Sequence, residues 1–292
     1  MVHGDGIPAW KRRQDRWIQA KRGGEVRPRV LSPDPESGSR AGRLHVVSQA
    51  FTDDRALDVA VSRALLQRVA AGELPESLRL ARPGAMVAFA KQDAVAPDYR
   101  SAVEAARDLG FEPVLRLAGG RAAVFHEQTI ALAHAVPDPT PRAGIHSRFD
   151  WTAELITRAL RRLGVDARIG EVPGEYCPGG YSVNARAAVK LAGIGQRIIA
   201  GASHLGGVIV VGDASRVRDV LVPVYQALDL AWDPRTAGAV EDELNGAASL
   251  SWTAVRGALL GEYGREYELV EAELDPETIA LARRLAAEHR PG

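Results

Sequence analysis

The chain reads RLAGGRAAVFH over residues 116–126, and this stretch is the starting point for its fold. Two adjacent glycines, Gly119 and Gly120, lie between short apolar runs, so we expect a tight turn between two strands. The bare backbone amides of such a turn can hold a carboxylate or a phosphate. Arg116 and Arg121 flank the glycines and can each bind an oxygen anion in a bidentate manner. The stretch therefore indicates an anion-binding turn.

His126 closes this stretch directly after an apolar run, so we expect it at the end of the second strand. The alternative interpretation of residues 116–126 is structural: a glycine hairpin with two solvated arginines and a packed histidine. The spacing alone favours the structural interpretation and leaves the anion-binding turn as the alternative.

A second stretch reads EYCPGGYSVN over residues 175–184 and continues as AVKLAGIGQR over 188–197. Cys177 lies in a loop rich in proline and glycine, where a thiol is more accessible than inside a strand or a helix. A neighbouring ammonium would lower the pKa of this thiol, and Lys190 is the nearby lysine in the sequence. At the end of an apolar strand, Lys190 would also suit a carbonyl or acyl phosphate oxygen. The alternative is a small loop residue and a surface charge.

Around these two stretches, short apolar runs alternate with helical periods, without a strict βαβ rhythm. Helices are expected over about 53–71, 99–109 and 216–228, and from Asp150, Leu244 and Asp275 onward. Short strands are expected near 44–48, 78–81, 86–90, 114–116, 122–125, 130–136, 167–169, 181–183, 187–191, 196–200 and 207–211. This pattern predicts an α+β fold with a mixed, mainly antiparallel sheet flanked by helices and a short helical C-terminal appendage.

Three regions are expected along the chain. Residues 1–42 combine prolines and glycines with no hydrophobic period, so we expect a poorly ordered tail. Residues 43–230 contain both stretches and form the main domain. Residues 231–292 are expected to form a small helical region, in which Asp275-Pro276 supplies an N-cap and a proline at the first helical position.

Composition excludes several classes of protein. The 292 residues have a formal net charge of zero and 5% aromatic residues, so we expect no surface for nucleic acid. Cys177 is the only cysteine, which excludes a disulfide framework and a multi-thiolate zinc site, and no metal site is expected. No apolar run approaches the ~20 residues needed to span a bilayer, and a secretory signal is missing. We therefore expect a cytoplasmic protein without membrane contacts.

The two stretches together resemble motifs in the catalytic domain shared by lipoate–protein ligases, octanoyltransferases and biotin–protein ligases. In that superfamily an Arg-x-x-Gly-Gly-Arg/Gly-x-x-x-His segment lines the acyl pocket. The matching positions are Arg116, Gly119, Gly120 and Arg121, and His126 follows after one more residue than in the family pattern. A later Lys-x-x-Gly-x-x-Gln segment supplies the essential lysine, and it matches Lys190, Gly193 and Gln196, followed by Arg197. The resemblance covers roughly residues 43–230, and the ordered pair of motifs is more specific than either one alone.

The resemblance implies that residues 43–230 are a catalytic domain with a bent sheet over a hydrophobic tunnel. An octanoyl or lipoyl chain would lie in the tunnel, with Lys190 at its acyl carbonyl. The acceptor would be the lysine of a lipoyl domain, in E2 of a 2-oxoacid dehydrogenase complex or in the glycine cleavage H protein. The chain would thus be an enzyme of lipoate metabolism that acylates another protein.

Two mechanisms are compatible with the resemblance. Octanoyltransferases form a cysteine thioester from acyl carrier protein and need no cofactor. ATP-dependent ligases form an acyl adenylate, need ATP and Mg, and typically carry a third glycine where this chain has Arg121. Arg121, and Cys177 in the loop before the lysine strand, favour a transferase with Cys177 as nucleophile and acyl carrier protein as a possible donor. A relative that only binds a lipid or a cofactor is a further alternative.

Overall fold

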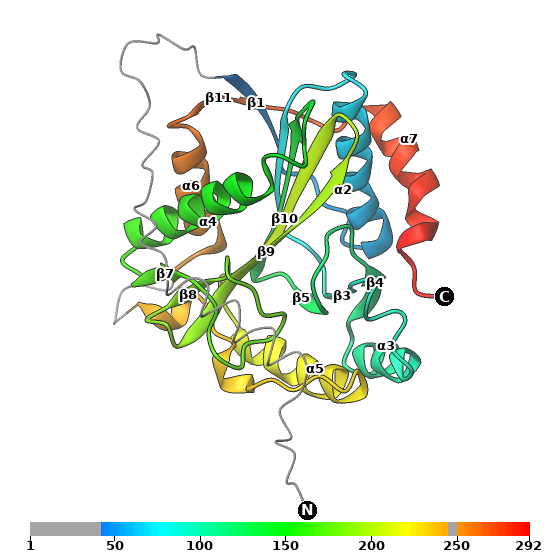
Figure 1. The fold of residues 1–292 in the computed structure, drawn as a ribbon, viewed down its shortest axis with the longest axis vertical. Helices are drawn as coiled ribbons and strands as arrows, with labels where there is room; N and C mark the ends of the chain where they lie inside the picture. The colour runs from blue at the N-terminus through cyan, green and yellow to red at the C-terminus, as the bar shows by residue number, and fades with distance from the viewer. Residues whose placement is uncertain (1–41, 245–249) are drawn as a thin grey trace, which may run out of the picture. The chain divides into compact units, whose positions relative to one another are not determined.

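The main β-sheet has eight strands in the order β11-β1-β2-β6-β10-β9-β8-β7 (Figure 1). The computed structural model describes residues 42–244 and 250–292 of the chain. β1 pairs in parallel with β2 and β11, and every other neighbouring pair is antiparallel, which confirms a mixed, mainly antiparallel sheet. The bounds are β1 (Gly42–Val47), β2 (Ser77–Ala81), β6 (Thr129–Pro137), β7 (Ala167–Ile169), β8 (Val183–Ala185), β9 (Val189–Ile199), β10 (Ala202–Val210) and β11 (Tyr267–Glu271).

A second, smaller sheet has the order β4-β3-β5. Its strands are β3 (Met86–Phe89), β4 (Glu112–Leu115) and β5 (Ala123–Phe125), and their apolar side chains pack on α3 (Tyr99–Asp108) and α5 (Ala214–Ala227). β4 ends at Leu115 and β5 begins at Ala123, so the glycine-rich turn of residues 116–122 connects two edge strands of this sheet.

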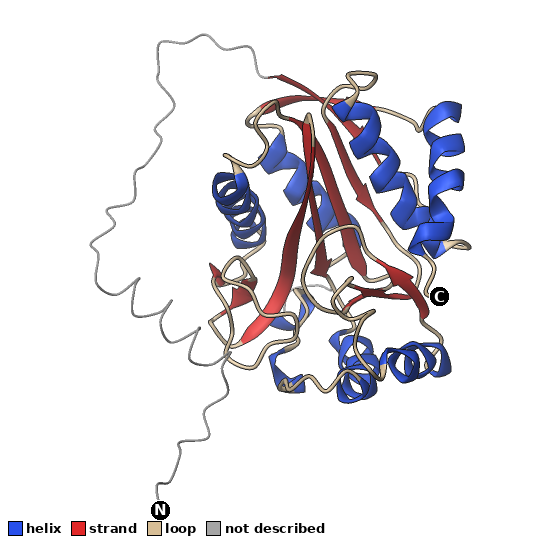
Figure 2. Cartoon of the chain, turned by 45° about the vertical axis from the view of Figure 1, so that its right-hand side comes forward, coloured by secondary structure: helices blue, strands red, loops and turns tan. Residues whose placement is uncertain are grey.

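Helices cover both faces of the main sheet (Figure 2). Successive side chains of a strand point to opposite faces, so Leu80 and Leu132 pack toward α4 (Ile145–Arg162) and α6 (Trp252–Tyr263). The alternate residues Arg79 and Ala133 face the other side, where α2 (Arg55–Ala70) and α7 (Pro276–Leu285) lie against each other. Short 3-10 turns complete the structure at Pro234–Thr236, Glu241–Glu243 and Ala286–His289.

The helix α2 begins and packs as its sequence predicts. The carboxylate of Asp54 accepts a hydrogen bond from the backbone N–H of Leu57 over 3.0 Å, which satisfies one free donor of the first turn. Val61 and Leu65 are buried together with Val47 of β1, so the helix is held by the core on this side of the sheet. This packing fixes one wall of the cavity described below.

Strand β9 differs most from its prediction. Two strands near 187–191 and 196–200 were expected, because Gly193 and Gly195 weaken a strand pattern. The structure has one continuous strand over Val189–Ile199, because both glycines pair across the ladder with β10, opposite Val208 and Gly206 respectively. Ladder hydrogen bonds thus outweigh the low strand propensity of glycine.

The C-terminal region contains a strand in addition to helices. Residues 231–292 were expected to be helical, and α6 and α7 are, but β11 between them pairs in parallel with β1 at the edge of the main sheet. Residues 42–244 and 250–292 belong to one compact unit. The proposed tail of residues 1–42 lies outside the described residues, apart from Gly42, which begins β1.

The helices of the described residues are all too short or too polar to cross a bilayer.

Candidate active site

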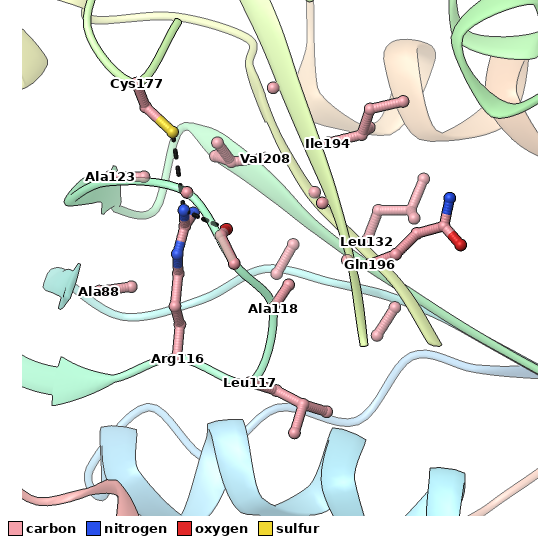
Figure 3. Close-up of a pocket in the computed structure, with 18 of the residues that line it drawn as sticks. Ala88, Arg116, Leu117, Ala118, Ala123, Leu132, Cys177, Ile194, Gln196 and Val208 are labelled. Atoms are coloured by element: carbon pink, nitrogen blue, oxygen red, sulfur yellow. Dashed lines mark hydrogen bonds between the residues drawn. The ribbon is translucent and has the colours of Figure 1, made fainter. Parts of the chain in front are cut away.

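A cavity of about 500 Å³ lies between the α2 side of the main sheet, the small sheet and the loop of residues 171–182 (Figure 3). Strands β3, β5, β6 and β10 turn small and apolar side chains toward it. These are Met86, Ala88, Ala123, Phe125, Ala131, Ala133 and Val208. A largely apolar pocket of this size, with few polar groups, suits a single small ligand with a hydrocarbon part.

The expected turn at Gly119-Gly120 forms one side of the cavity. Gly120 has φ +108°, which glycine adopts readily, and its carbonyl accepts a hydrogen bond from Nε2 of Gln92. The carbonyl of Gly119 accepts one from Nη2 of Arg116. A Cβ atom at position 120 would lie 2.9 Å from Sγ of Cys177, so the missing side chain lets the thiol approach the turn.

The backbone of Cys177 is fixed from behind by a tyrosine. Its φ of +43° lies in the left-handed region, which a residue with a side chain seldom adopts unless the surroundings hold it there. The backbone N–H of Cys177 donates to the hydroxyl of Tyr225 over 2.9 Å, and this hydroxyl donates to the carbonyl of Ala122, also over 2.9 Å. Tyr225 therefore ties the cysteine loop to the strand after the glycine turn.

The thiol of Cys177 lies at the cavity beside two hydrogen-bond donors. The backbone N–H of Arg121 donates to Sγ over 3.1 Å, and Nη2 of Arg116 lies 3.6 Å from Sγ. Burial raises the pKa of the thiol. The charges of Arg116 and Lys190 and the hydrogen bonds from Arg121 and Arg116 lower this pKa by more than burial raises it, so the pKa is below its ordinary value. A half-buried thiol with a lowered pKa carries more thiolate near neutral pH, which is the form that attacks carbonyl carbon.

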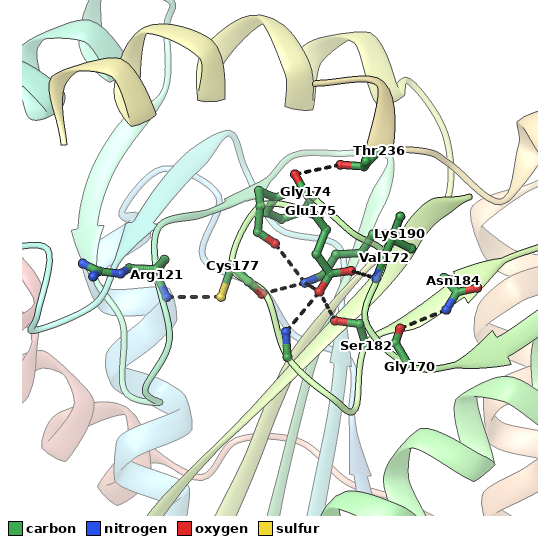
Figure 4. Close-up of polar contacts among 12 residues, drawn as sticks. Arg121, Gly170, Val172, Gly174, Glu175, Cys177, Ser182, Asn184, Lys190 and Thr236 are labelled. Carbon is green, nitrogen blue, oxygen red and sulfur yellow. Dashed lines mark hydrogen bonds and ion pairs between the residues drawn. The ribbon is translucent and has the colours of Figure 1, made fainter. Parts of the chain in front are cut away.

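Lys190 is buried, with 2% of its surface exposed, which excludes the alternative of a surface charge. It lies near the start of β9, and its ammonium donates to the carbonyls of Cys177 (2.8 Å) and Tyr176 (3.1 Å) and to Oε1 of Glu175 (3.1 Å) (Figure 4). An ammonium has three donors, and all three have partners here. Lys190 thus holds the peptide groups that precede and follow the Cα atom of Cys177.

Glu175 is the buried counterpart of Lys190, and the sequence did not indicate its role. Its carboxylate accepts hydrogen bonds from the backbone N–H groups of Val172 and Gly179 and from the hydroxyl of Ser182. With Lys190 these contacts satisfy a charge that would otherwise be costly inside the protein. The loop of residues 171–182 is therefore folded around one carboxylate, and Cys177 lies in this loop at the cavity.

Seven of the predicted site residues line the cavity. They are Arg116, Gly119, Gly120, Cys177, Lys190, Gly193 and Gln196. The side chain of Gln196 is directed to α4, where its amide donates to the carbonyl of Ile145 over 2.7 Å and its oxygen accepts from Nε of Arg148 over 3.1 Å. Gln196 thus ties β9 to the start of α4 at the cavity.

Three predicted site residues have side chains outside the cavity lining. The guanidinium of Arg121 pairs with the buried carboxylate of Asp93 over 3.2 Å, and only its backbone reaches the thiol. His126 is fully buried, and burial lowers its pKa to about 4, with Arg216 adding to the effect. Arg197 is exposed on β9.

The far part of the cavity has polar residues that no motif indicated. Arg79 of β2 and Asp58 of α2 form a buried ion pair on its wall, and His204 of β10 lines its floor. These residues come from three elements far apart in the sequence. An arginine at a buried strand position was a signal for the pair, but nothing in the sequence pointed to its partner.

The sequence model of a protein family, the lipoyl protein ligase A/B catalytic domain, matches residues 54–229 of this chain. This range includes the whole cysteine loop and both glycine-containing stretches. The chain belongs to this family. Its fold agrees with that of a lipoate-protein ligase A bound with ATP, at a TM-score of 0.68 and 18% identity over 85% of this chain and 94% of the other. A bipartite lipoate protein ligase from Thermoplasma acidophilum, described together with its E2 lipoyl domain, has a TM-score of 0.66 at 17% identity over 86% and 93%.

Curated relatives are more similar to this chain in sequence than these solved structures are. The octanoyl-[GcvH]:protein N-octanoyltransferase of Bacillus velezensis is 27% identical over 169 residues, which is 58% of each chain. Further relatives have the same name. The chain matches between 39% and 64% of the length of these relatives.

Proposed function

We propose that this protein transfers an octanoyl or lipoyl group to a lysine of a lipoyl-domain protein through a thioester on Cys177. The observation that carries the proposal is the thiol itself: Sγ lies at an apolar cavity, beside Arg116 and the N–H of Arg121, with a lowered pKa. The family and the name of the curated relatives support the same chemistry.

The reaction has two acyl-transfer steps. The Cys177 thiolate attacks the acyl carbonyl of the donor, and a C–S bond forms. Collapse of the tetrahedral intermediate breaks the bond to the leaving atom of the donor, which takes up a proton. The acceptor lysine amine then attacks the thioester, loses a proton as the amide forms, and returns Cys177 as thiolate. No oxidant, reductant or nucleotide is needed.

The residues around the thiol have distinct parts in this proposal. The guanidinium of Arg116 and the N–H of Arg121 already face Sγ, so they are near the oxyanion, which forms on the carbon that Sγ attacks, two bonds from the sulfur. Lys190 holds the carbonyls of Tyr176 and Cys177 and contributes its charge to the low thiol pKa. Lys190 is thus a positioning residue in this mechanism, with its ammonium directed to the loop.

The name of the relatives gives octanoyl-GcvH as their donor and a protein nitrogen as their acceptor, and this supports a choice of partners for the present chain. We propose octanoylated glycine cleavage H protein as the donor and the lipoyl domain of an E2 subunit as the acceptor. The leaving atom is then a lysine nitrogen. Octanoyl-acyl carrier protein, whose leaving atom is a thiol sulfur, is the other donor to be tested.

Intact-mass spectrometry tests the proposal directly. The protein is incubated in turn with octanoyl-GcvH, with octanoyl-acyl carrier protein, and with octanoate plus Mg-ATP, and then mixed with an E2 lipoyl domain. We expect a covalent octanoyl adduct from a protein donor, its absence in Cys177→Ser, and octanoylation of the E2 lysine. Circular dichroism confirms that the variant is folded.

Other results would replace this proposal with one of the alternatives. Full transfer by Cys177→Ser, with pyrophosphate released from octanoate and Mg-ATP, would make the chain an ATP-dependent lipoate–protein ligase. Binding of the fatty acid without transfer under any of the three conditions would make it a non-catalytic relative. The transferase itself requires no cofactor, whereas the ligase requires ATP and Mg.

A further inference from the structure

The cavity runs across the strands of the main sheet from the thiol toward α2. Gly195 of β9, Gly206 of β10, Ala133 of β6 and Arg79 of β2 face one another in register, and all four line the cavity. Three steps between strands span roughly 14 Å. The carbonyl of Gly119 would lie 3.3 Å from a Cβ at position 195, so the catalytic turn stands over the β9 end.

A buried ion pair closes the β2 end of the cavity. Arg79 is 2% exposed, and its Nη2 donates to a carboxylate oxygen of Asp58. Nη1 of Arg79 donates to the carbonyl of Asp58 over 3.1 Å, and Nε to that of Gln49 over 2.9 Å. Bonds to two backbone segments make this end a fixed wall, because moving the guanidinium would leave a buried charge unpaired.

His204 forms the floor between the two ends. Its ring lies over Gly206, where a Cβ atom would meet Nε2 at 2.6 Å, so the glycine makes room for the imidazole. The residue is 4% exposed, and its Nδ1 has no hydrogen-bond partner in the described parts of the chain. Burial, with a smaller effect of His134, lowers its pKa to about 4, so the ring is neutral near pH 7. The imidazole therefore occupies volume next to the path from the thiol to Arg79.

We propose that His204 is a specificity-determining residue that limits the size of the acyl tail. This inference rests on the proposed function, because it assigns the tail to the part of the cavity between Gly195 and Arg79. Among residues 42–244 and 250–292, no group pairs with Nδ1 of His204, so removing the ring takes no partner from this side of it. His204→Ala therefore enlarges the cavity without breaking a hydrogen bond of that atom, and longer or bulkier tails gain space.

The experiment measures binding and transfer separately. Isothermal titration calorimetry with hexanoate, octanoate, decanoate, dodecanoate and lipoate gives the size preference without any chemistry. Transfer rates with the matching acyl-GcvH donors give the size preference of the reaction. For His204→Ala we expect the decanoyl-to-octanoyl ratio to rise by about tenfold or more in both measurements, which is the scale of one or two methylene groups in a pocket.

Two further variants keep the test decisive. His204→Phe restores an aromatic ring and should return the ratio toward that of the natural protein. Ala133→Leu fills the same path from β6 and should shift the preference toward hexanoate, even if His204→Ala folds poorly. Unchanged ratios in His204→Ala and Ala133→Leu, with octanoate still bound, would overturn the assignment of the tail and leave the Cys177 proposal intact. A shifted ratio for binding, without any transfer, would support the assignment of the tail and contradict the Cys177 proposal.

Discussion

The backbone N–H of Arg121 donates a hydrogen bond to Sγ of Cys177 over 3.1 Å, although the two residues are 56 positions apart in the chain. This contact joins the glycine-arginine turn to the cysteine loop. Tyr225 and Lys190 hold the loop in place from other sides. Cys177, the proposed nucleophile, is thus positioned by contacts to the backbone of its loop, and the variants below test those of Lys190 and Tyr225.

Replacing Arg116 with glutamine should raise the pKa of the Cys177 thiol. The guanidinium favours the thiolate, so its loss shifts the equilibrium toward the neutral thiol. Alkylation by iodoacetamide rises with pH as the thiolate forms, so the curve of Arg116→Gln should lie at higher pH than that of the natural protein. Cys177 is the only cysteine, and Cys177→Ser provides the background. Superimposable curves would contradict the assigned role of Arg116.

Replacing Lys190 with methionine should destabilise the fold by about 3–5 kcal/mol, because Glu175 would keep a buried charge without its partner. Urea unfolding monitored by circular dichroism gives the free energy of unfolding. Adding Glu175→Gln to Lys190→Met removes the unpaired charge and should recover part of this loss. If the double variant is less stable than Lys190→Met, unpaired charge is not the cause of the instability.

Replacing Tyr225 with phenylalanine should slow acyl transfer and cost about 1–3 kcal/mol of stability, because the N–H of Cys177 and the carbonyl of Ala122 lose their partner. Tyr99→Phe is the matched control. The Tyr99 hydroxyl is also buried, but it has no partner among the described residues, so its removal breaks no hydrogen bond. Equal effects of the two substitutions on adduct formation would argue against a positioning role for Tyr225.

Replacing Gly120 with alanine should impair thiol reactivity more than replacing Gly119. A Cβ at position 120 would lie 2.9 Å from Sγ of Cys177 and would be strained by a φ of +108°, whereas a Cβ at position 119 meets nothing within 4 Å. The iodoacetamide rate and the unfolding midpoint of both variants measure the difference. A larger effect at Gly119 would place the functional constraint on the other glycine.

The sequence by itself determined the mixed α+β fold and the family. Hydrophobic periods located most helices and strands, and the N-cap of α7 at Asp275 was indicated by its residue type. A glycine-arginine turn, followed later in the chain by a strand that contains Lys190, indicated the family. These signals are local, since turn chemistry, capping and period each depend on residues within a few positions.

Only the tertiary structure decided what surrounds the thiol and what closes the cavity. Lys190 was expected to face an acyl carbonyl, yet its ammonium faces Glu175 and the cysteine loop. The register of four strands brings Arg79 and His204 to one cavity. Pairing between distant strands produces no periodic pattern in the sequence, so these neighbours could not be predicted. The physical reason is that buried polar groups must find partners wherever the fold brings them together, and the identity of those partners depends on the whole sheet.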